Sequence, residues 1–260
     1  MRILILTQED NLYLPSALQY VCRELADSIV CIVSSPAMST HGGGVRGFLR
    51  HAHLFGFFGT SVIGIRIGRA KAFAMLTKPN KESHQYSVRQ VAAAWHVPFH
   101  AVAKINSDQL HRIIDEYKPD LLISLSCPQI IGKKVRQRFP KGCINVHGSP
   151  LPRYRGLMPA FWVLRNGESR TGVTVHDLEA RLDDGDILIQ RDVDITPDDS
   201  WDSLVRRTKA IGATALVEAV RQIEAGTVAR KPNRREDATY YSFPTAADRK
   251  AFLAMGRRFF

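Results

Sequence analysis

The 260-residue sequence has only four cysteines and lacks a long apolar run, and we do not expect a secretory signal. Its longest uncharged apolar stretch, residues 54–65, is shorter than the roughly 20 residues needed to span a bilayer. Met1 and Arg2 lead into a short apolar run without a small-residue cleavage site. The cysteines lie far apart without a Cys-x-x-Cys pair, which predicts neither disulfides nor a zinc site: Cys22, Cys31, Cys127 and Cys143. We therefore expect a cytoplasmic protein with no transmembrane helix and no metal.

Acidic residues are missing from a long early stretch. Between Ser28 and Lys81 there is no Asp or Glu, but there are seven basic residues: Arg46, Arg50, Arg66, Arg69, Lys71, Lys78 and Lys81. Residues 221–260 hold nine basic and four acidic residues, so the two segments carry +7 and +5, and the rest of the chain carries −1 of the net charge of +11. The remaining chain is nearly neutral. This distribution disfavours a nucleic-acid enzyme, which would more often have its positive field beside the active site.

Apolar runs alternate with helical periodicity in the first half of the chain. Residues 2–7 and 28–34 resemble buried strands, and residues 14–25 between them have apolar side chains at helical spacing. The pattern returns later, with helices predicted at 107–117 and 133–139 and strands at 121–125 and 143–146. This alternation predicts an α/β fold with a Rossmann-like, mostly parallel sheet flanked by helices.

Two segments interrupt or extend this pattern. Residues 37–81 contain a Gly42-Gly43-Gly44 run near their start. This segment predicts one or two basic helices inserted into the sheet domain. Strands are predicted at 171–178 and 186–194, followed by a helix for which Asp198, Asp199 and Ser200 offer an N-cap and which Gly226 closes. A late strand at 240–243 belongs to a short C-terminal appendage. We expect a catalytic domain at residues 1–200 and a helix with this appendage at 201–260.

The densest polar cluster lies at the end of the strand predicted at 143–146. Residues two apart in an extended segment share a face, so Asn145 and His147 can point into one cleft. An amide and an imidazole suit acyl transfer, because one stabilises an oxyanion and the other moves a proton. Asp183, in the loop before Gly185, can complete the set. The structural alternative is that Asn145 caps a turn, His147 is a satisfied edge histidine and Asp183 shapes its loop.

Three sequence blocks occur in a fixed order: INVHGSPLPRYRG at 144–156, TGVTVH at 171–176 and LDDGDIL at 182–188. They resemble the folate-dependent formyltransferase family, which acts on methionyl-tRNA, glycinamide ribonucleotide or nucleotide-linked amino sugars. The resemblance implies that Asn145, His147 and Asp183 are catalytic. Asp183 is preferred to Asp184 because the family's acid precedes the glycine by two positions.

The resemblance also implies a formyl donor, 10-formyltetrahydrofolate. The amine of the acceptor attacks the formyl carbon, Asn145 and His147 stabilise the oxyanion, and Asp183 helps to move protons. By matching positions, the folate is expected to contact two segments: Pro128, Gln129, Ile130 and Ile131 in the first, and Glu179, Arg181 and Leu182 in the second. Plain core packing is the alternative for the two isoleucines.

The identity of the amine acceptor is less constrained. The first strand is followed by Gln8, Glu9 and Asp10, without the glycine-rich phosphate loop of glycinamide ribonucleotide formyltransferases. About 35 residues follow the last predicted helix, too few for the barrel domain of tRNA formyltransferases. A nucleotide-linked amino sugar is therefore the expected acceptor, with methionyl-tRNA as the alternative. Candidate substrate-binding residues are Glu9, Asp10, Arg153, Tyr154, Arg155 and Trp162.

Other interpretations remain open at this point. Water in place of the amine would make the protein a 10-formyltetrahydrofolate hydrolase, and loss of activity would leave a basic binding protein that keeps the fold. The insert at 37–81 can be a helical cover or subunit contact, a surface for polyanions or nucleotides, or a peripheral membrane contact. A single late strand with Tyr240 and Tyr241 suggests a homodimer through the appendage.

Overall fold

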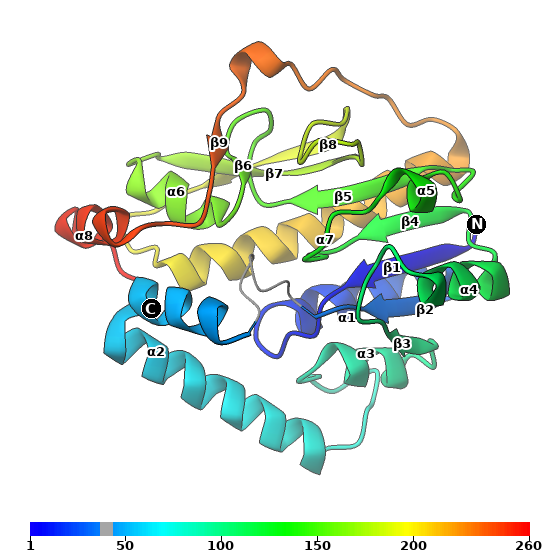
Figure 1. Ribbon diagram of the computed structural model, residues 1–260, viewed down its shortest axis with the longest axis horizontal. Helices are drawn as coiled ribbons and strands as arrows, with labels where there is room; N and C mark the ends of the chain where they lie inside the picture. The colour runs from blue at the N-terminus through cyan, green and yellow to red at the C-terminus, as the bar shows by residue number, and fades with distance from the viewer. Residues whose placement is uncertain (37–43) are drawn as a thin grey trace.

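A seven-stranded sheet forms the centre of the protein. The structure, a computed structural model, describes residues 1–36 and 44–260 (Figure 1). The strand order is β3-β2-β1-β4-β5-β7-β8. The first five strands in this order are parallel to one another. Strand β7 runs antiparallel to both of its neighbours, β5 and β8. Their bounds are β1 Ile3–Thr7, β2 Ile29–Ser34, β3 Phe99–Ala101, β4 Leu121–Ser124, β5 Cys143–His147, β7 Arg170–Asp177 and β8 Ile187–Asp194. The predicted mostly parallel α/β sheet is confirmed.

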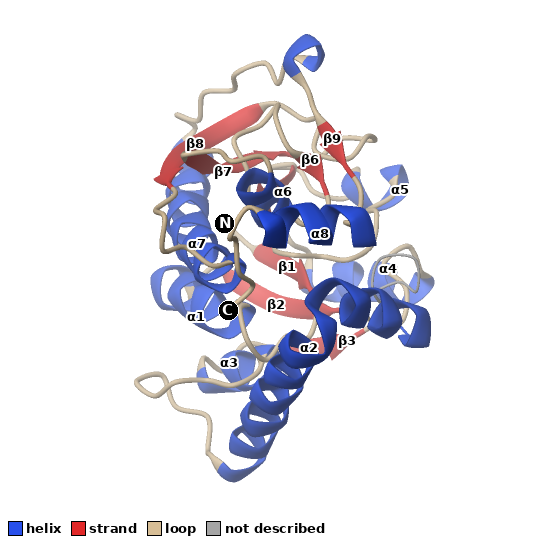
Figure 2. Ribbon diagram, turned by 90° about the vertical axis from the view of Figure 1, so that its left-hand side faces the viewer, coloured by secondary structure: helices blue, strands red, loops and turns tan. Residues whose placement is uncertain are grey.

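Helices cover both faces of this sheet, as Figure 2 shows. On one face lie α1 (Leu14–Leu25), α3 (Val88–Ala94) and α7 (Trp201–Ala225). On the other lie α4 (Asp108–Tyr117) and α5 (Lys133–Arg136). All five residues of β1 are buried, because its alternate side chains enter two different hydrophobic cores. This explains the uninterrupted apolar run in the sequence, which is typical of parallel strands.

The long helix α7 follows the boundaries predicted from its ends. Ser200 and Ser203 form a capping box at its start, and Gly226 ends it with a φ of 70°. The helix packs against α1, β7 and β8, so it belongs to the helical layer on one face of the sheet. The domain division at residue 200 stays a prediction.

The predicted insert contains a long helix, α2 (Gly44–Leu76). At Gly56 the backbone leaves helical geometry, with φ 68° and ψ −179°, so two helical segments meet at a kink. Gly42 and Gly43 lie outside the described residues. Within the ranges that the structure describes, no helix is both long and apolar enough to cross a membrane.

The C-terminal appendage returns to the segment that follows β5. Its strand β9 (Tyr240–Tyr241) pairs in parallel with β6 (Arg155–Gly156), and helix α8 (Ala246–Ala254) packs against α6 (Pro159–Arg165). A short 3-10 helix, η1 (Arg235–Asp237), precedes β9. The late strand therefore has a partner within its own chain, which removes the reason given for a homodimer. The oligomeric state stays a prediction.

Several local boundaries differ from the sequence-based expectation. Helix α5 has four residues and ends at Arg136, where a helix to residue 139 was predicted. His147 is the last residue of β5, not the first residue after it. Five further elements have from two to nine residues and no clear signal in the sequence: α3, β3, α6, β6 and α8. Such short elements carry little periodicity, so tertiary packing decides them.

Candidate active site

Strand β5 places Asn145 and His147 on the same face of the sheet. Ile144 belongs to the core formed with α1 and α7, and a Cβ on Gly212 of α7 would lie 2.9 Å from Val146 Cγ1. The alternation of a strand therefore turns Asn145 and His147 to the opposite face. The antiparallel neighbour β7 places His176 opposite Asn145.

Two histidines present one ring nitrogen each to the same carboxylate. The Nε2–H of His147 donates to the Tyr154 carbonyl at 2.8 Å, which leaves Nδ1 facing Asp183 Oδ2 at 3.6 Å. The Nδ1–H of His176 donates to the Asp177 carbonyl at 2.8 Å. Its Nε2 then lies 3.1 Å from Asn145 Nδ2 and 3.6 Å from Asp183 Oδ1. The carbonyl contacts fix both ring orientations.

Asp183 is a buried carboxylate in a left-handed backbone conformation. Its φ is 52° and its side chain is 4% exposed. Burial by itself raises the pKa of this carboxyl. His147, His176 and the Gly156 N–H, which donates to Oδ2 at 2.9 Å, more than offset burial and lower the pKa to about 2. Asp183 is therefore ionised at neutral pH.

The neighbouring Asp184 has a different environment. Arg155 Nη1 donates to its Oδ1 at 2.5 Å, and Arg235 pairs with it from the C-terminal appendage. The Arg235 and Arg155 guanidinium groups hold the pKa of Asp184 below its usual range, against the effect of burial. The two adjacent carboxylates thus face separate partners, histidines for Asp183 and arginines for Asp184.

The family model for formyl transferase matches residues 68–220, more than half of the chain. This chain belongs to the formyl transferase family. The resemblance carried by the three sequence blocks is thereby confirmed. A methionyl-tRNA formyltransferase from Syntrophus aciditrophicus is 38% identical over 153 residues, which are 59% of this chain and 49% of that protein. The chain spans about half the length of the curated relatives it matches.

Solved structures share the fold. A phosphoribosylglycinamide formyltransferase from Anaplasma phagocytophilum has a TM-score of 0.61 at 17% identity, covering 94% of this chain and 99% of that one. An N-formyltransferase from Helicobacter canadensis, in complex with folinic acid and dTDP-3-aminofucose, has a TM-score of 0.57 at 17% identity. The latter match covers 93% of this chain and 71% of the other.

In this formyl transferase family member, a loop runs from β5 back to Asp183, which the sequence predicts to be catalytic. Gly156 has a φ of 100°, and a Cβ there would lie 2.2 Å from the Tyr241 carbonyl oxygen of β9. A glycine is therefore needed for β6 to pair with β9 while its N–H donates to Asp183. Asn233 holds the other side of this site, because its Nδ2 donates to the carbonyls of Asp183 and Gly185, both at 3.0 Å.

The residues predicted to contact folate lie on two loops. Pro128 precedes Gln129, whose side chain accepts from Ile105 N at 3.1 Å and donates to the Ala103 carbonyl at 3.2 Å. Ile130 is 64% exposed, whereas Ile131 is buried in the core on the α4 and α5 face. On the second loop, Glu179, Arg181 and Leu182 are all exposed.

A lysine links α7 to the first of these loops. Lys209 Nζ donates to the hydroxyl of Ser126, which has a left-handed φ of 58° just after β4. Burial lowers the pKa of Lys209, and the charge of Asp10 opposes this effect. Nothing in the sequence marks Lys209, since a lone lysine on a helix usually faces solvent.

The residues predicted to bind the acceptor fall into two separate groups. Glu9 lines a cavity of about 420 Å³ at the carboxyl ends of β1, β2 and β3, and it accepts from Val88 N at 3.0 Å. Burial raises the Glu9 pKa. Asp10 accepts from three backbone N–H groups at the start of α1.

The second group is engaged within the protein. Arg153 forms an ion pair with Glu168, and the Tyr154 hydroxyl donates to the same carboxylate at 2.6 Å. Trp162 is buried and donates to the Ser242 carbonyl at 3.0 Å. Arg155 binds Asp184 and Asn233. The tyrosine and tryptophan rings both pack against Tyr241, so the structure places these aromatics in the core.

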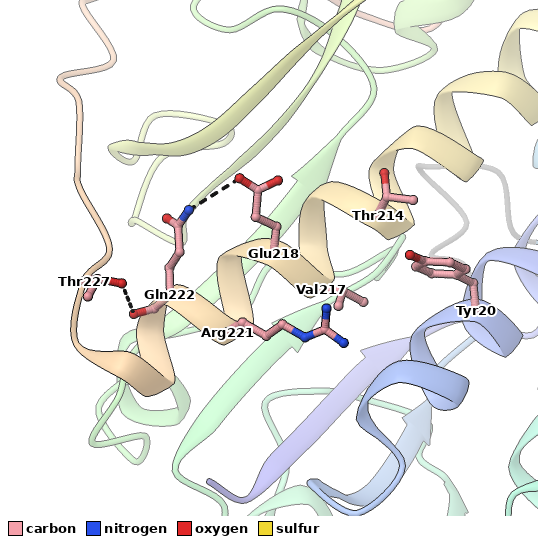
Figure 3. Close-up of a pocket in the computed structure, with 7 residues that line it drawn as sticks. All are labelled: Tyr20, Thr214, Val217, Glu218, Arg221, Gln222 and Thr227. Carbon is pink, nitrogen blue, oxygen red and sulfur yellow. Dashed lines mark hydrogen bonds between the residues drawn. The ribbon is translucent and has the colours of Figure 1, made fainter.

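Three residues of the site were missed by sequence reasoning: Gly156, His176 and Asn233. His176 was visible within the TGVTVH block, but only the pairing of β5 with β7 shows that it faces Asn145. A second cavity of about 430 Å³ lies between α1 and α7, with Tyr20, Glu218 and Arg221 among its lining residues (Figure 3). It is on the sheet face opposite to Asn145 and His147, so it is not part of this site.

Proposed function

We propose that this chain transfers a formyl group from 10-formyltetrahydrofolate to a primary amine, with Asn145, His147 and Asp183 as catalytic residues. The observation that supports this function best is the meeting of an amide, two imidazoles and an ionised carboxylate around the end of β5. Formyl transfer needs such groups because an oxyanion must be stabilised and a proton must leave the attacking amine.

The chemistry of each side chain suggests its role. The Asn145 amide donates to the developing oxyanion. His147 Nε2 is occupied by the Tyr154 carbonyl, so Nδ1 is the ring atom that can donate or move a proton. A carboxylate with a pKa of about 2 is a weak base, so Asp183 acts mainly through its charge, which stabilises the ammonium formed on attack.

The proposed reaction moves one formyl group from the donor to the acceptor and one proton from the acceptor to the donor. The nitrogen of the neutral acceptor forms a bond to the formyl carbon, and the bond from that carbon to the donor nitrogen breaks. The proton lost by the acceptor nitrogen passes to the donor nitrogen, with Asp183 and His147 beside its path. Because a protonated amine has no lone pair to attack with, turnover should decrease at low pH.

The two predicted folate loops fit a flat aromatic ring. Ile130 and Leu182 are apolar but 64% and 45% exposed, so they offer unpacked hydrophobic surface. A pterin can gain contact there while polar loop groups bind its edges. The residues proposed to hold the donor are Pro128, Gln129, Ile130, Ile131, Glu179, Arg181 and Leu182.

For the acceptor we propose an amino sugar attached to a nucleotide, bound in the cytoplasm. The cavity beside Glu9 has a size typical of small-molecule sites. It lies at the carboxyl ends of parallel strands, where ligands bind in open α/β sheets. Methionyl-tRNA is the second candidate, since the curated relatives include methionyl-tRNA formyltransferases.

Alanine substitution of each proposed catalytic residue tests the site. Asn145→Ala, His147→Ala and Asp183→Ala should each lower turnover by about 10²-fold or more, because they remove, in turn, an oxyanion donor, an imidazole that moves a proton and the charge that stabilises the ammonium. Circular dichroism checks that the variants stay folded, and Arg112→Ala, at an exposed position of α4, serves as a control. Turnover near that of the wild type in all three variants would refute the proposed site.

A panel of acceptors tests the substrate. The wild type is incubated with 10-formyltetrahydrofolate and either amino-sugar nucleotides or charged tRNA, and formylated products are measured by mass spectrometry. Formylation of a sugar nucleotide supports the first candidate, and formylation of methionyl-tRNA alone replaces it by the second. Release of free formate without any acceptor would identify a hydrolase.

A further inference from the structure

The outer face of α2 exposes a row of large apolar side chains. In Figures 1 and 2, α2 forms the outer edge of the molecule. Phe57 is 92% exposed, Phe58 77%, Met75 87% and Leu76 82%. With 3.6 residues per turn, these four positions and the exposed Ile65 lie on one side of the second helical segment. An exposed apolar surface of this kind is typical of a binding face.

The opposite side of α2 is attached to the protein, so the exposure does not come from a detached helix. Phe55 packs against Trp201 and Phe259, with ring centroids 5.0 and 5.1 Å apart. Arg66 forms a 3.0 Å ion pair with Asp202 on α7. Near the end of the helix, the Gln90 side chain donates to the Ala74 carbonyl at 2.9 Å. These contacts fix one side of α2 to the protein and leave its apolar side exposed to solvent.

Basic residues flank this face. Arg69 and Lys71 are exposed and lie on opposite sides of the apolar row, and the exposed Lys78 and Lys81 follow the helix. The sequence contains no acidic residue from Ser28 to Lys81. A helix with an apolar row between cations matches the boundary of an anionic lipid surface, where apolar groups enter the acyl region and cations bind headgroups.

We propose that the outer face of α2 binds the surface of an anionic lipid bilayer. The face would hold the protein on the membrane without crossing it. A second copy of this chain is a poorer occupant, because a two-fold contact through α2 would bring two purely basic stretches together. A phosphate backbone alone is also a poorer match, because it offers no apolar surface for Phe57, Phe58, Met75 and Leu76.

Vesicle flotation tests this proposal directly. The full chain is mixed with vesicles of phosphatidylcholine alone or with added phosphatidylglycerol, and the bound fraction is measured at low and physiological salt. We expect binding to the anionic vesicles that weakens with salt. Phe57→Ser with Phe58→Ser should lower the partition coefficient about tenfold or more, as should Met75→Ser with Leu76→Ser.

Charge variants separate headgroup binding from net charge. Arg69→Glu with Lys71→Glu should weaken binding about tenfold, whereas Arg112→Glu with Lys141→Glu, at exposed positions on another face, should leave it nearly unchanged. Thermal melting verifies that each variant is folded. Failure of the wild type to float with anionic vesicles at low salt would overturn the proposal, as would equal binding by the Phe57/Phe58 variant. If the wild type self-associated without lipid and the Phe57/Phe58 variant did not, the face would instead be assigned to binding a second copy of the chain.

Discussion

At the level of single residues, Asp183 combines a left-handed backbone with a buried charge. Its carboxylate lies between His147 and His176, and the Gly156 N–H donates to it. Burial raises the pKa of a carboxyl, but the histidines and this N–H bring it down to about 2. These contacts favour the ionised form of Asp183 in the folded protein and so couple its protonation to stability.

The first prediction concerns this coupling. The folded-state pKa of Asp183, about 2, lies below the ordinary aspartate value of 3.8, so the ionised carboxylate stabilises the fold above about pH 5. The contribution is about 2 kcal/mol and is lost as pH falls from about 5 through 2. Chemical unfolding of the wild type and Asp183→Asn over this range should show their free-energy difference changing by that amount. Parallel pH profiles would contradict it, and Asp237→Asn, at an exposed position, serves as the control.

At the level of elements, the C-terminal appendage supports the loops that hold Tyr154 and Asp183. Strand β9 pairs with β6, and the Thr239 hydroxyl accepts from Tyr154 N at 2.8 Å. Asn233 binds the backbone on both sides of Asp184 and also accepts from Arg155 at 2.8 Å. The position of Asp183 thus depends on residues about 50 positions later in the chain.

The second prediction tests this support. Asn233→Ala removes the two hydrogen bonds to the carbonyls of Asp183 and Gly185, so the carboxylate should move relative to His147. We expect kcat to decrease about 10- to 100-fold with a smaller change in KM, because misplacement affects the transition state most. Steady-state kinetics measures both constants. Asn166→Ala, which loses bonds to two tyrosine hydroxyls, should keep a near wild-type kcat. Equal losses in the two variants would contradict a positioning role.

At the level of the whole molecule, the tail completes a hydrophobic core. Phe252 of α8 is fully buried against Phe161 of α6 and Phe259 near the C-terminus, with ring centroids 4.9 and 4.7 Å apart. The same core includes Phe55 of α2 and Trp201 of α7. The insert, the tail and the sheet therefore share one packed region, although they are far apart in the sequence.

The third prediction compares two adjacent residues of α8. Phe252→Ala should reduce the free energy of unfolding by about 3–5 kcal/mol, because it leaves a cavity in this core. Leu253→Ala, at a position that is 41% exposed, should reduce the free energy of unfolding by less than about 1 kcal/mol. Denaturant titration measures both changes. If Phe252→Ala were as mild as Leu253→Ala, the tail would not be part of the core.

The strongest local patterns in the sequence predicted their elements closely. Helix α1 has the bounds expected from its apolar spacing. Helix α7 begins after Ser200, one of the three candidate cap residues, and ends at the predicted Gly226. Caps and periodicity depend on residues within one or two turns, so they are readable from the chain. The two tyrosines of β9 gave only a weak signal, and the pairing with β6 that defines this strand is not local.

The sequence by itself determined the alternation of strands and helices, the shared face of Asn145 and His147, and the family blocks that include Asp183. Each depends on neighbours along the chain. Only the tertiary structure brought His176 and Asn233 to Asp183, directed Asp184 to Arg155 and Arg235, and left the apolar side of α2 exposed. Those arrangements depend on which distant segments pack together, and packing is fixed by contacts that no local pattern contains.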